Sequence, residues 1–417
     1  MVMQSIVVHP VVKRARSADA RPPEVKLAEC VRLAQAIDLT VTDAFLVGVS
    51  ALRPSHYIGG GALEVIHERM ETAGAGLLIM DCALSPLQQR NLERDLKVKV
   101  LDRTGLILDI FGARAHTHEG KLQVEMAALT FQRSRLVRSW THLERQRGGF
   151  GFLGGPGESQ LEIDRRLIET RLRRLKTDLE KIKQNRSLQR SHRPYPLVAL
   201  MGYTNVGKST LFNRLVGGDV LVKDMPFATL DPTLRLLALP SGLRVILSDT
   251  VGFISDLPTA LIAAFRATLD DVKSADIIVH VHDASSPWHA DETRDVNGVL
   301  ADLGVQGIPI VDVWNKADAL NEEDKQLFSL ESSPVLLSAQ TGDGVPLLLK
   351  TLDKLLLEKR QLVDVFCPLE NPAHRAWLHE HGAQTTEAET ETGWHITTFL
   401  APQHVARAHV AADKPFP

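Results

Sequence analysis

Short apolar runs alternate with helical patterns over residues 1–115. Residues 77–80 and 106–110 are nearly continuous apolar runs of strand length, whereas residues 64–72 and 86–96 space their apolar side chains as a helix does. We therefore expect buried strands at the first two segments and helices at the other two. Alternating elements of this kind predict a small α/β domain.

Residues 116–193 have a different, heptad-like pattern. Apolar side chains recur at steps of three, four and seven residues in two blocks, and Ser159 with Glu162 forms a capping box at the start of the second block. The pattern predicts two long helices that pack as an antiparallel hairpin. The seam positions are Leu122, Met126, Leu129, Leu136, Trp140 and Leu143, then Leu161, Ile168, Leu172, Leu175, Leu179 and Ile182.

Residues 194–358 return to alternating strands and helices, after Pro194 and Pro196 break the second long helix. The pattern predicts a doubly wound sheet, a fold that binds ligands at the carboxyl ends of its strands. Residues 359–417 predict a small α+β appendage with a strand at 394–400. Strand-like runs of the main sheet occur at 197–201, 234–239, 243–248, 276–283, 308–314 and 334–338.

The composition narrows the class of protein. The 417 residues have room for two to four domains, and an apolar content of 44% is enough for packed cores. Cys30, Cys82 and Cys367 have neither disulfide nor zinc spacing, which predicts reduced thiols. The first apolar stretch is too short for a secretory signal, and no run approaches a membrane span in length. We expect a cytoplasmic monomer, with peripheral membrane contact left open.

The net charge of −3 conceals an uneven distribution. Residues 133–193 hold sixteen Lys and Arg against seven Asp and Glu, so the rest of the chain carries about −12. A basic segment on an acidic protein is typical of a surface that binds nucleic acid. The alternative, a solvated helix face with internal ion pairs, fits residues 178–183 but fits residues 171–176 poorly. The candidate RNA contacts here are Arg165, Arg166, Arg171, Arg173 and Arg174.

The tract that joins the two long helices, residues 148–157, has six glycines in ten positions. It cannot bury a core of its own, yet it carries Phe150 and Phe152. A flexible connector is one interpretation. We favour a functional tip that becomes ordered on contact with a partner, because a pure linker has no use for two phenylalanines.

Residues 202–209 have the spacing G-x-x-x-x-G-K-S between a strand-like run and a helical pattern, which is the context that a phosphate-binding loop requires. Backbone N–H groups of such a loop, and the N-terminus of the following helix, bind phosphate oxygens. Lys208 would reach the β- and γ-phosphates, and the Ser209 hydroxyl would bind Mg²⁺. The rest of the loop is Gly202, Tyr203, Thr204, Asn205, Val206 and Gly207.

Two further segments follow the phosphate loop along the chain, and each suits the Mg²⁺ or the γ-phosphate of a bound nucleotide. Asp249, at the end of a strand, would hold Mg²⁺ through water, and the Gly252 N–H would sense the γ-phosphate. The switch segment before it must offer a hydroxyl to Mg²⁺, for which we choose Thr229, with Thr233 in reserve. The candidate residues of both segments are Phe227, Ala228, Thr229, Leu230, Asp231, Asp249, Thr250, Val251 and Gly252.

The sequence N-K-A-D at residues 315–318 predicts guanine specificity. A carboxylate at Asp318 accepts from two guanine donors, and adenine would leave it unpaired. Asn315 would meet the N7 and O6 edge, and the stem of Lys316 would cover the base. An ATPase with a chance match is the alternative. The remaining candidates are Ala317 and the S-A-Q segment Ser338, Ala339 and Gln340, which supplies a backbone N–H to guanine O6.

The position after the D-x-x-G segment is also informative. Many GTPases have a water-orienting Gln there, and this chain has Phe253. We therefore predict slow intrinsic hydrolysis that a partner or another residue completes, with the catalytic group unassigned. Asn205 lies where some GTPases help to hold K⁺, so a potassium requirement is a hypothesis.

The chain resembles the HflX family of translation-factor-related GTPases between about residues 46 and 358. The most specific segment is G-G-P-G-E-S-Q-L-E-I-D-R-R at 154–166. The chain departs from the family at Ala62, where Lys is usual, and residues 359–417 have little family signature. Other matching segments are 81–86, 89–93, 102–111, 122–125, 202–205, 227–233 and 249–253.

The resemblance implies a bacterial cytoplasmic GTPase that binds the large ribosomal subunit and splits or rescues ribosomes under stress. It implies that the N-terminal domain and hairpin contact ribosomal RNA, with residues 148–157 reaching toward the peptidyl-transferase region, and that the ribosome stimulates hydrolysis. It also implies ATP binding near the N-terminus, for which the sequence shows no motif. Two alternatives stay open: a GTPase that assembles ribosomes, and a GTP-gated RNA-binding module.

Overall fold

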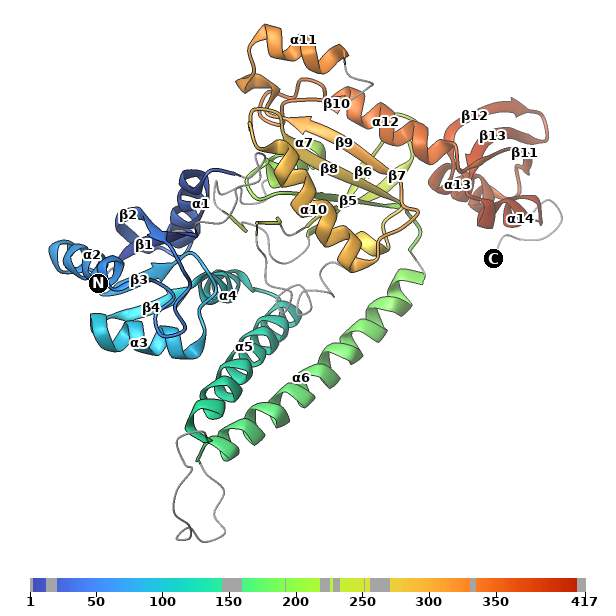
Figure 1. Ribbon diagram of the computed structural model, residues 1–417. Coiled ribbons are helices and arrows are strands. Elements are labelled where there is room, and N and C mark those ends of the chain that lie inside the picture. Colours follow the sequence, from blue (N-terminus) through green and yellow to red (C-terminus); the bar gives the residue numbers. More distant parts are fainter. Residues whose placement is uncertain are drawn as a thin grey trace.

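The computed structural model describes residues 3–12, 21–144, 160–191, 193–217, 226–227, 233–250, 252–255, 271–330 and 335–410. An α/β domain, a helical hairpin, a larger α/β domain and a small C-terminal domain follow one another along the chain (Figure 1). Eight residues singled out in the sequence lie outside the described ranges. They are Phe150, Phe152, Ser159, Ala228, Thr229, Leu230, Asp231 and Val251.

The N-terminal domain is a four-stranded parallel sheet in the order β2-β1-β3-β4. The helix predicted at 86–96 is confirmed; Ser85 and Gln88 form a capping box at its start, with proline at the first helical position. The strand at 77–80 and the helix around 64–72 are also confirmed. The elements are β1 (Gln4–Val12), α1 (Pro23–Gln35), β2 (Thr40–Val49), α2 (Gly60–Ala73), β3 (Leu77–Met80), α3 (Pro86–Leu96), β4 (Lys99–Asp102) and α4 (Arg103–Arg114).

The strand predicted at 106–110 is wrong, because these residues lie within α4. The Asp102 carboxylate caps this helix by accepting the Gly105 N–H at 2.8 Å. The helix is buried on nearly every side, so its apolar residues form a run rather than a stripe, and such a run does not distinguish a buried strand from a buried helix.

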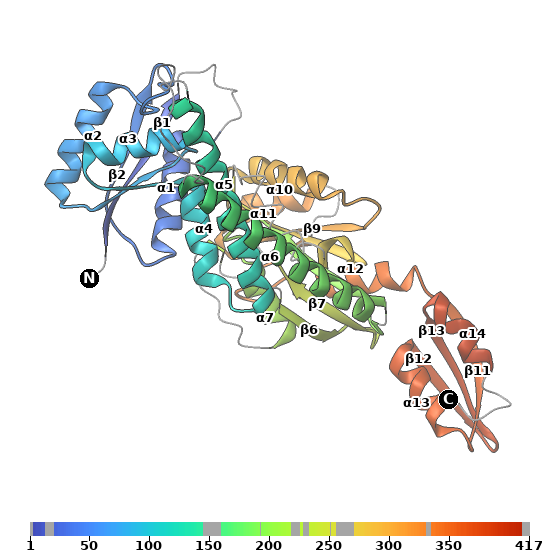
Figure 2. The ribbon, with the colours of Figure 1, turned by 90° about the horizontal axis from the view of Figure 1, so that it is seen from below.

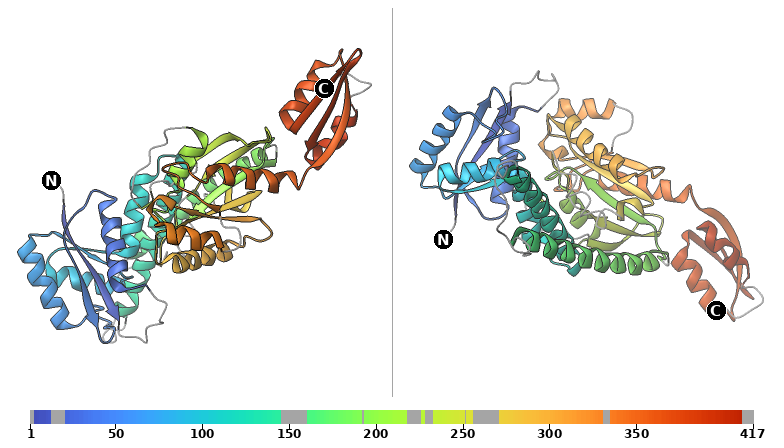
Figure 3. Two further views of the ribbon diagram at one scale, coloured as in Figure 1. Left: turned by 90° about the horizontal axis from the view of Figure 1, so that it is seen from above. Right: turned by 60° about the horizontal axis from the view of Figure 1, so that its bottom comes forward.

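The hairpin consists of α5 (His118–Glu144) and α6 (Gln160–Ser191), which run side by side in opposite directions, and α6 continues to the second α/β domain (Figures 1 and 3). This confirms the hairpin predicted from the heptad pattern. Leu175 is 1% exposed in the seam, whereas Leu167 is 62% exposed. Arg171 forms a two-pronged ion pair across the hairpin with Glu125, at 2.6 and 2.8 Å.

The second α/β domain is built on a six-stranded sheet in the order β10-β9-β8-β5-β7-β6. All neighbours are parallel except β6, which lies antiparallel at the edge. Residues Gly202, Asp249, Asp283 and Asn315 are therefore gathered at one edge of the sheet, because each ends a parallel strand. The elements are β5 (Leu197–Gly202), α7 (Lys208–Val216), β6 (Thr233–Ala238), β7 (Arg244–Asp249), β8 (Ile277–Asp283), α10 (His289–Leu303), β9 (Ile310–Asn315), η1 (Ala317–Ala319), α11 (Glu322–Leu330), β10 (Val335–Leu336) and α12 (Val345–Leu357).

The C-terminal domain has an antiparallel sheet in the order β11-β13-β12 and its own small core, as expected of an α+β appendage. It lies at the opposite end of the molecule from the N-terminal domain (Figure 2). In the part of the chain that the structure describes, no helix is long and apolar enough to cross a membrane. The elements are β11 (Gln361–Pro368), α13 (Pro372–His381), β12 (Ala383–Thr390), β13 (Gly393–Leu400) and α14 (Pro402–Val410).

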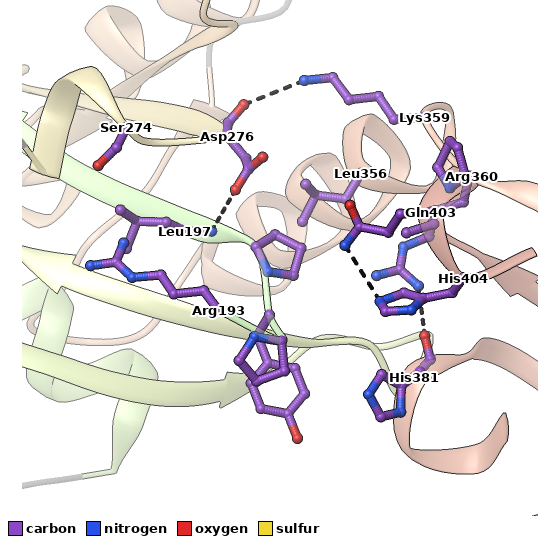
Figure 4. A pocket seen from close by; sticks show the side chains of 15 residues that line it. Arg193, Leu197, Ser274, Asp276, Leu356, Lys359, Arg360, His381, Gln403 and His404 are labelled. Carbon is purple, nitrogen blue, oxygen red and sulfur yellow. Dashed lines mark hydrogen bonds between the residues drawn. The ribbon is translucent and has the colours of Figure 1, made fainter. Parts of the chain in front are cut away.

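A pocket of about 380 Å³ lies where the C-terminal domain meets the sheet domain (Figure 4). The Asp276 carboxylate accepts the Leu197 N–H at 2.7 Å on one side, and the cationic side chains of Arg360 and Lys359 belong to the other. The pocket therefore forms at the joint between the two domains.

The hairpin seam gives a matched test of packing. We expect Leu175→Ala to destabilise the hairpin by about 2–5 kcal/mol, because it leaves a cavity at a buried position. Leu167→Ala on the same helix should change stability by less than about 0.5 kcal/mol. Hydrogen exchange of the α6 amides measures both effects. Equal protection in the two variants would contradict the described packing.

Candidate functional site

The loop after β5 has the backbone of a phosphate cradle. Asn205 and Gly207 have positive φ angles of 63° and 91°, and α7 begins at Lys208. A side chain at position 207 would place its Cβ 2.3 Å from Asn315 Nδ2, so only glycine fits there. This backbone turns N–H groups inward at the start of a helix, which is the arrangement that binds phosphate oxygens.

Lys208 is held inside this loop. Its ammonium donates to the carbonyl oxygens of Tyr203 at 2.6 Å and Gly202 at 3.1 Å. Burial lowers the pKa of Lys208 to about 8, while the charge of Asp249 opposes that shift. The side chain is therefore a desolvated cation next to the phosphate cradle.

Ser209, a predicted Mg²⁺ ligand, is in contact with Asp249, which was predicted to hold the ion through water. The Ser209 hydroxyl donates to Asp249 Oδ2 at 2.8 Å, and the Asp249 carboxylate is fully buried at the end of β7. A hydroxyl and a carboxylate are hard oxygen ligands, which suit Mg²⁺. The neighbouring Thr250 hydroxyl donates to the Leu200 carbonyl at 2.6 Å, so this side chain fixes β7 against β5.

The residues predicted to recognise guanine are joined to the phosphate loop. The Asn315 amide donates to the Val206 carbonyl at 2.8 Å and accepts the Ala339 N–H at 2.8 Å. The Ser338 hydroxyl donates to Asp318 Oδ1 at 2.5 Å and orients this exposed carboxylate. The N-K-A-D and S-A-Q segments therefore lie together, as their chemistry requires.

The other residues predicted for the N-K-A-D and S-A-Q segments also contact neighbouring elements. Lys316 pairs with Asp283 at 2.7 Å, and the Ala317 N–H donates to the Leu337 carbonyl at 3.1 Å. The carbonyl of Gln340 accepts from Arg214. These contacts fix the two segments predicted to recognise guanine to β8, to α7 and to each other.

A pocket of about 520 Å³ opens beside the loop, a volume suited to a small-molecule ligand. Its walls come from the phosphate loop, from Asp283 and Lys316 on the base side, and from Glu24 and Glu29 of α1 in the N-terminal domain. The N-terminal domain therefore forms part of the wall beside the candidate nucleotide site.

Tyr203 connects the phosphate loop to the N-terminal domain. Its hydroxyl donates to Glu29 Oε2 at 2.5 Å and accepts from Arg21 at 2.8 Å and from the Ser255 N–H at 2.7 Å. Burial raises the pKa of Tyr203, and the charge of Glu29 raises it further, so the phenol stays protonated. The phosphate loop, the segment after D-x-x-G and α1 thus meet at one oxygen atom.

Arg103 supports this contact from α4. Its guanidinium donates to Asp81 at 2.6 Å, to Glu29 at 2.5 Å and to the Ser255 carbonyl at 3.0 Å. Burial by itself lowers the pKa of Arg103, but the two carboxylates outweigh that effect and the net pKa is raised.

Sequence reasoning did not find the partners of this network. Arg21, Glu29, Asp81 and Ser255 match no nucleotide-binding motif, and the positions that join them are far apart in sequence. The motif that includes Tyr203 constrains only its glycines, Lys and Ser. The network arises from the packing of two domains, for which a single sequence holds no local signal.

The two phenylalanines near the switch segments point into the protein. Phe227 is buried against Phe111 of α4, with ring centroids 4.7 Å apart. Phe253 is 2% exposed, and its backbone pairs with the phosphate loop through the Thr204 N–H, at 2.7 Å. A buried phenyl ring cannot orient water, so the position after D-x-x-G supplies no catalytic group.

The cationic candidates on α6 are exposed but differ in their partners. Arg165 pairs with Glu169 at 3.1 Å, Arg171 is bound to Glu125, and Arg173 donates to the Glu169 carbonyl. Arg166 is also exposed. Within the described ranges, Arg173, Arg174 and Lys176 form no ion pair, so the unneutralised charge of the helix lies around residues 173–176.

Three family models match consecutive parts of the chain. A model described as GTP-binding GTPase N-terminal matches residues 24–112, and one described as GTP-binding GTPase Middle Region matches residues 114–193. A third, described as 50S ribosome-binding GTPase, matches residues 197–316.

Curated relatives match over most of the chain. A protein of Magnetococcus marinus named GTPase HflX is 46% identical over 390 residues, covering 91% of this chain and 89% of the relative. A protein of Escherichia coli K12 with the same name is 47% identical over 312 residues, 73% of each chain. Among solved structures, a GTP-binding protein from Sulfolobus solfataricus in complex with GDP matches 85% of this chain and 98% of its own, with 24% identity and a TM-score of 0.44.

The lowered pKa of Lys208 predicts how nucleotide affinity depends on pH. Above about pH 8 the unbound lysine loses its proton, whereas phosphate would hold the ammonium charged, so binding must take up a proton. We expect GTP affinity to fall by up to roughly tenfold per pH unit above that point. Calorimetry in buffers of different ionisation enthalpy would detect the uptake. Lys208→Ala should bind weakly with no such slope; a slope that persists in this variant would contradict the assignment.

Proposed function

The chain belongs to the HflX family of GTPases, as its sequence resemblance predicted, and from this premise we propose that it binds the large ribosomal subunit and splits or rescues stalled ribosomes. The protein hydrolyses GTP, and its sheet domain matches a family of ribosome-binding GTPases. The 50S subunit as partner, and splitting or rescue as outcome, are the proposal.

Nucleotide binding would use the residues gathered at the sheet edge. Lys208 and the backbone N–H groups around Gly207 would hold the phosphates, and Asp318 with Asn315 would select guanine. Mg²⁺ bound by Ser209 and by Thr229 of the switch segment, and held through water by Asp249, would neutralise phosphate charge. Asn205, exposed at the loop, is the candidate for K⁺.

The single observation that supports a ribosomal partner is the basic hairpin. It projects away from the nucleotide site, and its exposed cations on α6 include Arg174 and Lys176, which have no neutralising partner among the described residues (Figure 1). Phosphate-rich RNA is the natural partner for such a surface. The net charge of the rest of the chain is negative, so the excess of cations is concentrated on the hairpin, where RNA would bind.

Hydrolysis would depend on that partner. The side chain of Phe253 offers no water-orienting group. The hydrogen bonds of Tyr203 hold Ser255, just after the D-x-x-G segment, against the N-terminal domain. We infer slow turnover by the protein alone and faster turnover when ribosome binding at the hairpin and N-terminal domain rearranges this segment.

We expect mature large subunits to stimulate GTP turnover and the protein to deplete the 70S peak on sucrose gradients. Turnover is measured alone, with large subunits, with whole ribosomes and with free ribosomal RNA. No stimulation by any ribosomal particle would overturn the proposal. Stimulation only by immature subunits would favour an assembly factor, and stimulation by free RNA alone an RNA-binding module. Lys176→Glu should reduce stimulation several-fold, whereas Lys181→Glu, a lysine 3.7 Å from Asp178, should reduce it less.

Guanine selection is tested by exchanging an acceptor for a donor. We expect Asp318→Asn to weaken GTP binding about 10- to 100-fold and to improve binding of xanthosine triphosphate, whose ring presents a carbonyl where guanine has its amine. Competition with a fluorescent nucleotide measures both affinities. Glu323→Gln, an exposed position on α11, is the matched control and should change neither. Unchanged GTP affinity in Asp318→Asn would show the guanine assignment to be wrong.

A further inference from the structure

Four side chains that play no part in the nucleotide site lie on one face of β8 and β9. His280 is the register partner of Asp312, and His282 is the partner of Trp314. Because side chains alternate along strands, these positions point to the same side of the sheet. Helix α10 covers part of this face, where Thr293 contacts His282.

The two histidines and the aspartate form a compact group. His282 Nε2 lies 2.9 Å from Asp312 Oδ1, and His280 Nδ1 lies 3.5 Å from the same oxygen. One ligand atom from each residue lies within 4.8 Å of the other two. Ligands of a tetrahedral zinc ion, each at about 2.0–2.1 Å, stand roughly 3.3 Å from one another. Small side-chain adjustments would therefore bring all three atoms to bonding distance.

The hydrogen bonds of His282 fix how its ring is presented. The Thr293 hydroxyl gives its proton to the His289 carbonyl at 2.7 Å, so at its 3.0 Å contact with His282 Nδ1 it must accept. His282 Nδ1 therefore carries a proton, and Nε2 faces Asp312. In that tautomer Nε2 has a lone pair, which would meet a carboxylate unfavourably unless a cation lies between them or a second proton is bound.

The surroundings also suit a bound ion. The side chains of His280 and His282 are only 3% and 4% exposed, whereas the Asp312 side chain is 58% exposed and leaves a route from solvent. Trp314 stacks on His282 with ring centroids 4.7 Å apart and holds the imidazole in place. A ligating histidine that donates its other ring N–H to a fixed acceptor, as His282 does to Thr293, is the usual arrangement around a metal.

We propose that His280, His282 and Asp312 form a site for a divalent transition metal of the zinc class, with water as the fourth ligand. Two imidazoles and one carboxylate suit Zn²⁺ better than Mg²⁺, which prefers oxygen ligands alone. The site is separate from the hard-oxygen pair of Ser209 and Asp249. A bound metal would tie β8 to β9, because the two histidines lie on β8 and Asp312 lies on β9. The site is next to the predicted guanine-recognition loop, because His282 directly precedes Asp283, the ion-pair partner of Lys316.

Cobalt is the probe, because Co²⁺ replaces Zn²⁺ and absorbs visible light when four-coordinate. The nucleotide-free full chain is titrated with Co²⁺ in the presence of a weak competing chelator, which suppresses binding to scattered surface histidines. We expect one Co²⁺ per chain and its displacement by Zn²⁺. The absorption should be lost in His282→Asn and in Asp312→Asn. It should persist in His289→Asn, a neighbouring α10 histidine outside the group, and in His395→Asn, whose ring lies 3.7 Å from Asp364 in the C-terminal domain.

A second measurement keeps the test independent of folding defects. Bound Co²⁺ should quench Trp314 fluorescence in the wild type but not in Asp312→Asn, whose exposed side chain can be replaced without disturbing the core. Trp314→Phe should remove the quenched component. Absence of the absorption in the wild type, or its persistence in both Asp312→Asn and His282→Asn, would overturn the proposal and leave an imidazolium–carboxylate ion pair only.

Discussion

A guanidinium inside a protein needs anionic partners, and the way Arg103 meets this constraint organises the contact between two domains. Asp81 and Glu29 neutralise the Arg103 guanidinium within the N-terminal domain. The same guanidinium also donates a hydrogen bond to the Ser255 carbonyl of the sheet domain. Breaking a buried pair by removing one partner costs about 3–5 kcal/mol. The segment after D-x-x-G is thus held by charge as well as by packing, and Tyr203 extends the same network into the phosphate loop.

The sheet explains why residues from distant parts of the chain meet. Parallel strands end at one edge, so the phosphate loop, Asp249, Asp283 and Asn315 lie together although more than a hundred residues separate the first from the last. Asn315 links the loops directly, because its amide binds the phosphate loop on one side and the Ala339 N–H on the other. The segments predicted to bind phosphate and to recognise the base are therefore joined at one end of the sheet.

The outcome of sequence reasoning depended on whether a feature was local. The apolar spacing of residues 86–96 and the motif of the glycine loop are each contained in a short segment, so α3 and the phosphate cradle could be predicted. The helical structure of residues 106–110 could not be predicted, because an apolar run is compatible with either a buried strand or a buried helix such as α4. The partners of Tyr203 and the grouping of His282 with Asp312 depend on which strands and domains become neighbours, and no spacing along the chain encodes that.

The Phe111–Phe227 contact packs the residue at the start of the predicted switch segment against α4 of the N-terminal domain. Such an edge-to-face pair contributes about 0.5–1.5 kcal/mol beyond its buried area. Any rearrangement of the backbone at Phe227 must either carry α4 with it or separate the two rings. The aromatic pair is therefore a direct physical link, through which a displacement at Phe227 would be transmitted to α4 of the N-terminal domain.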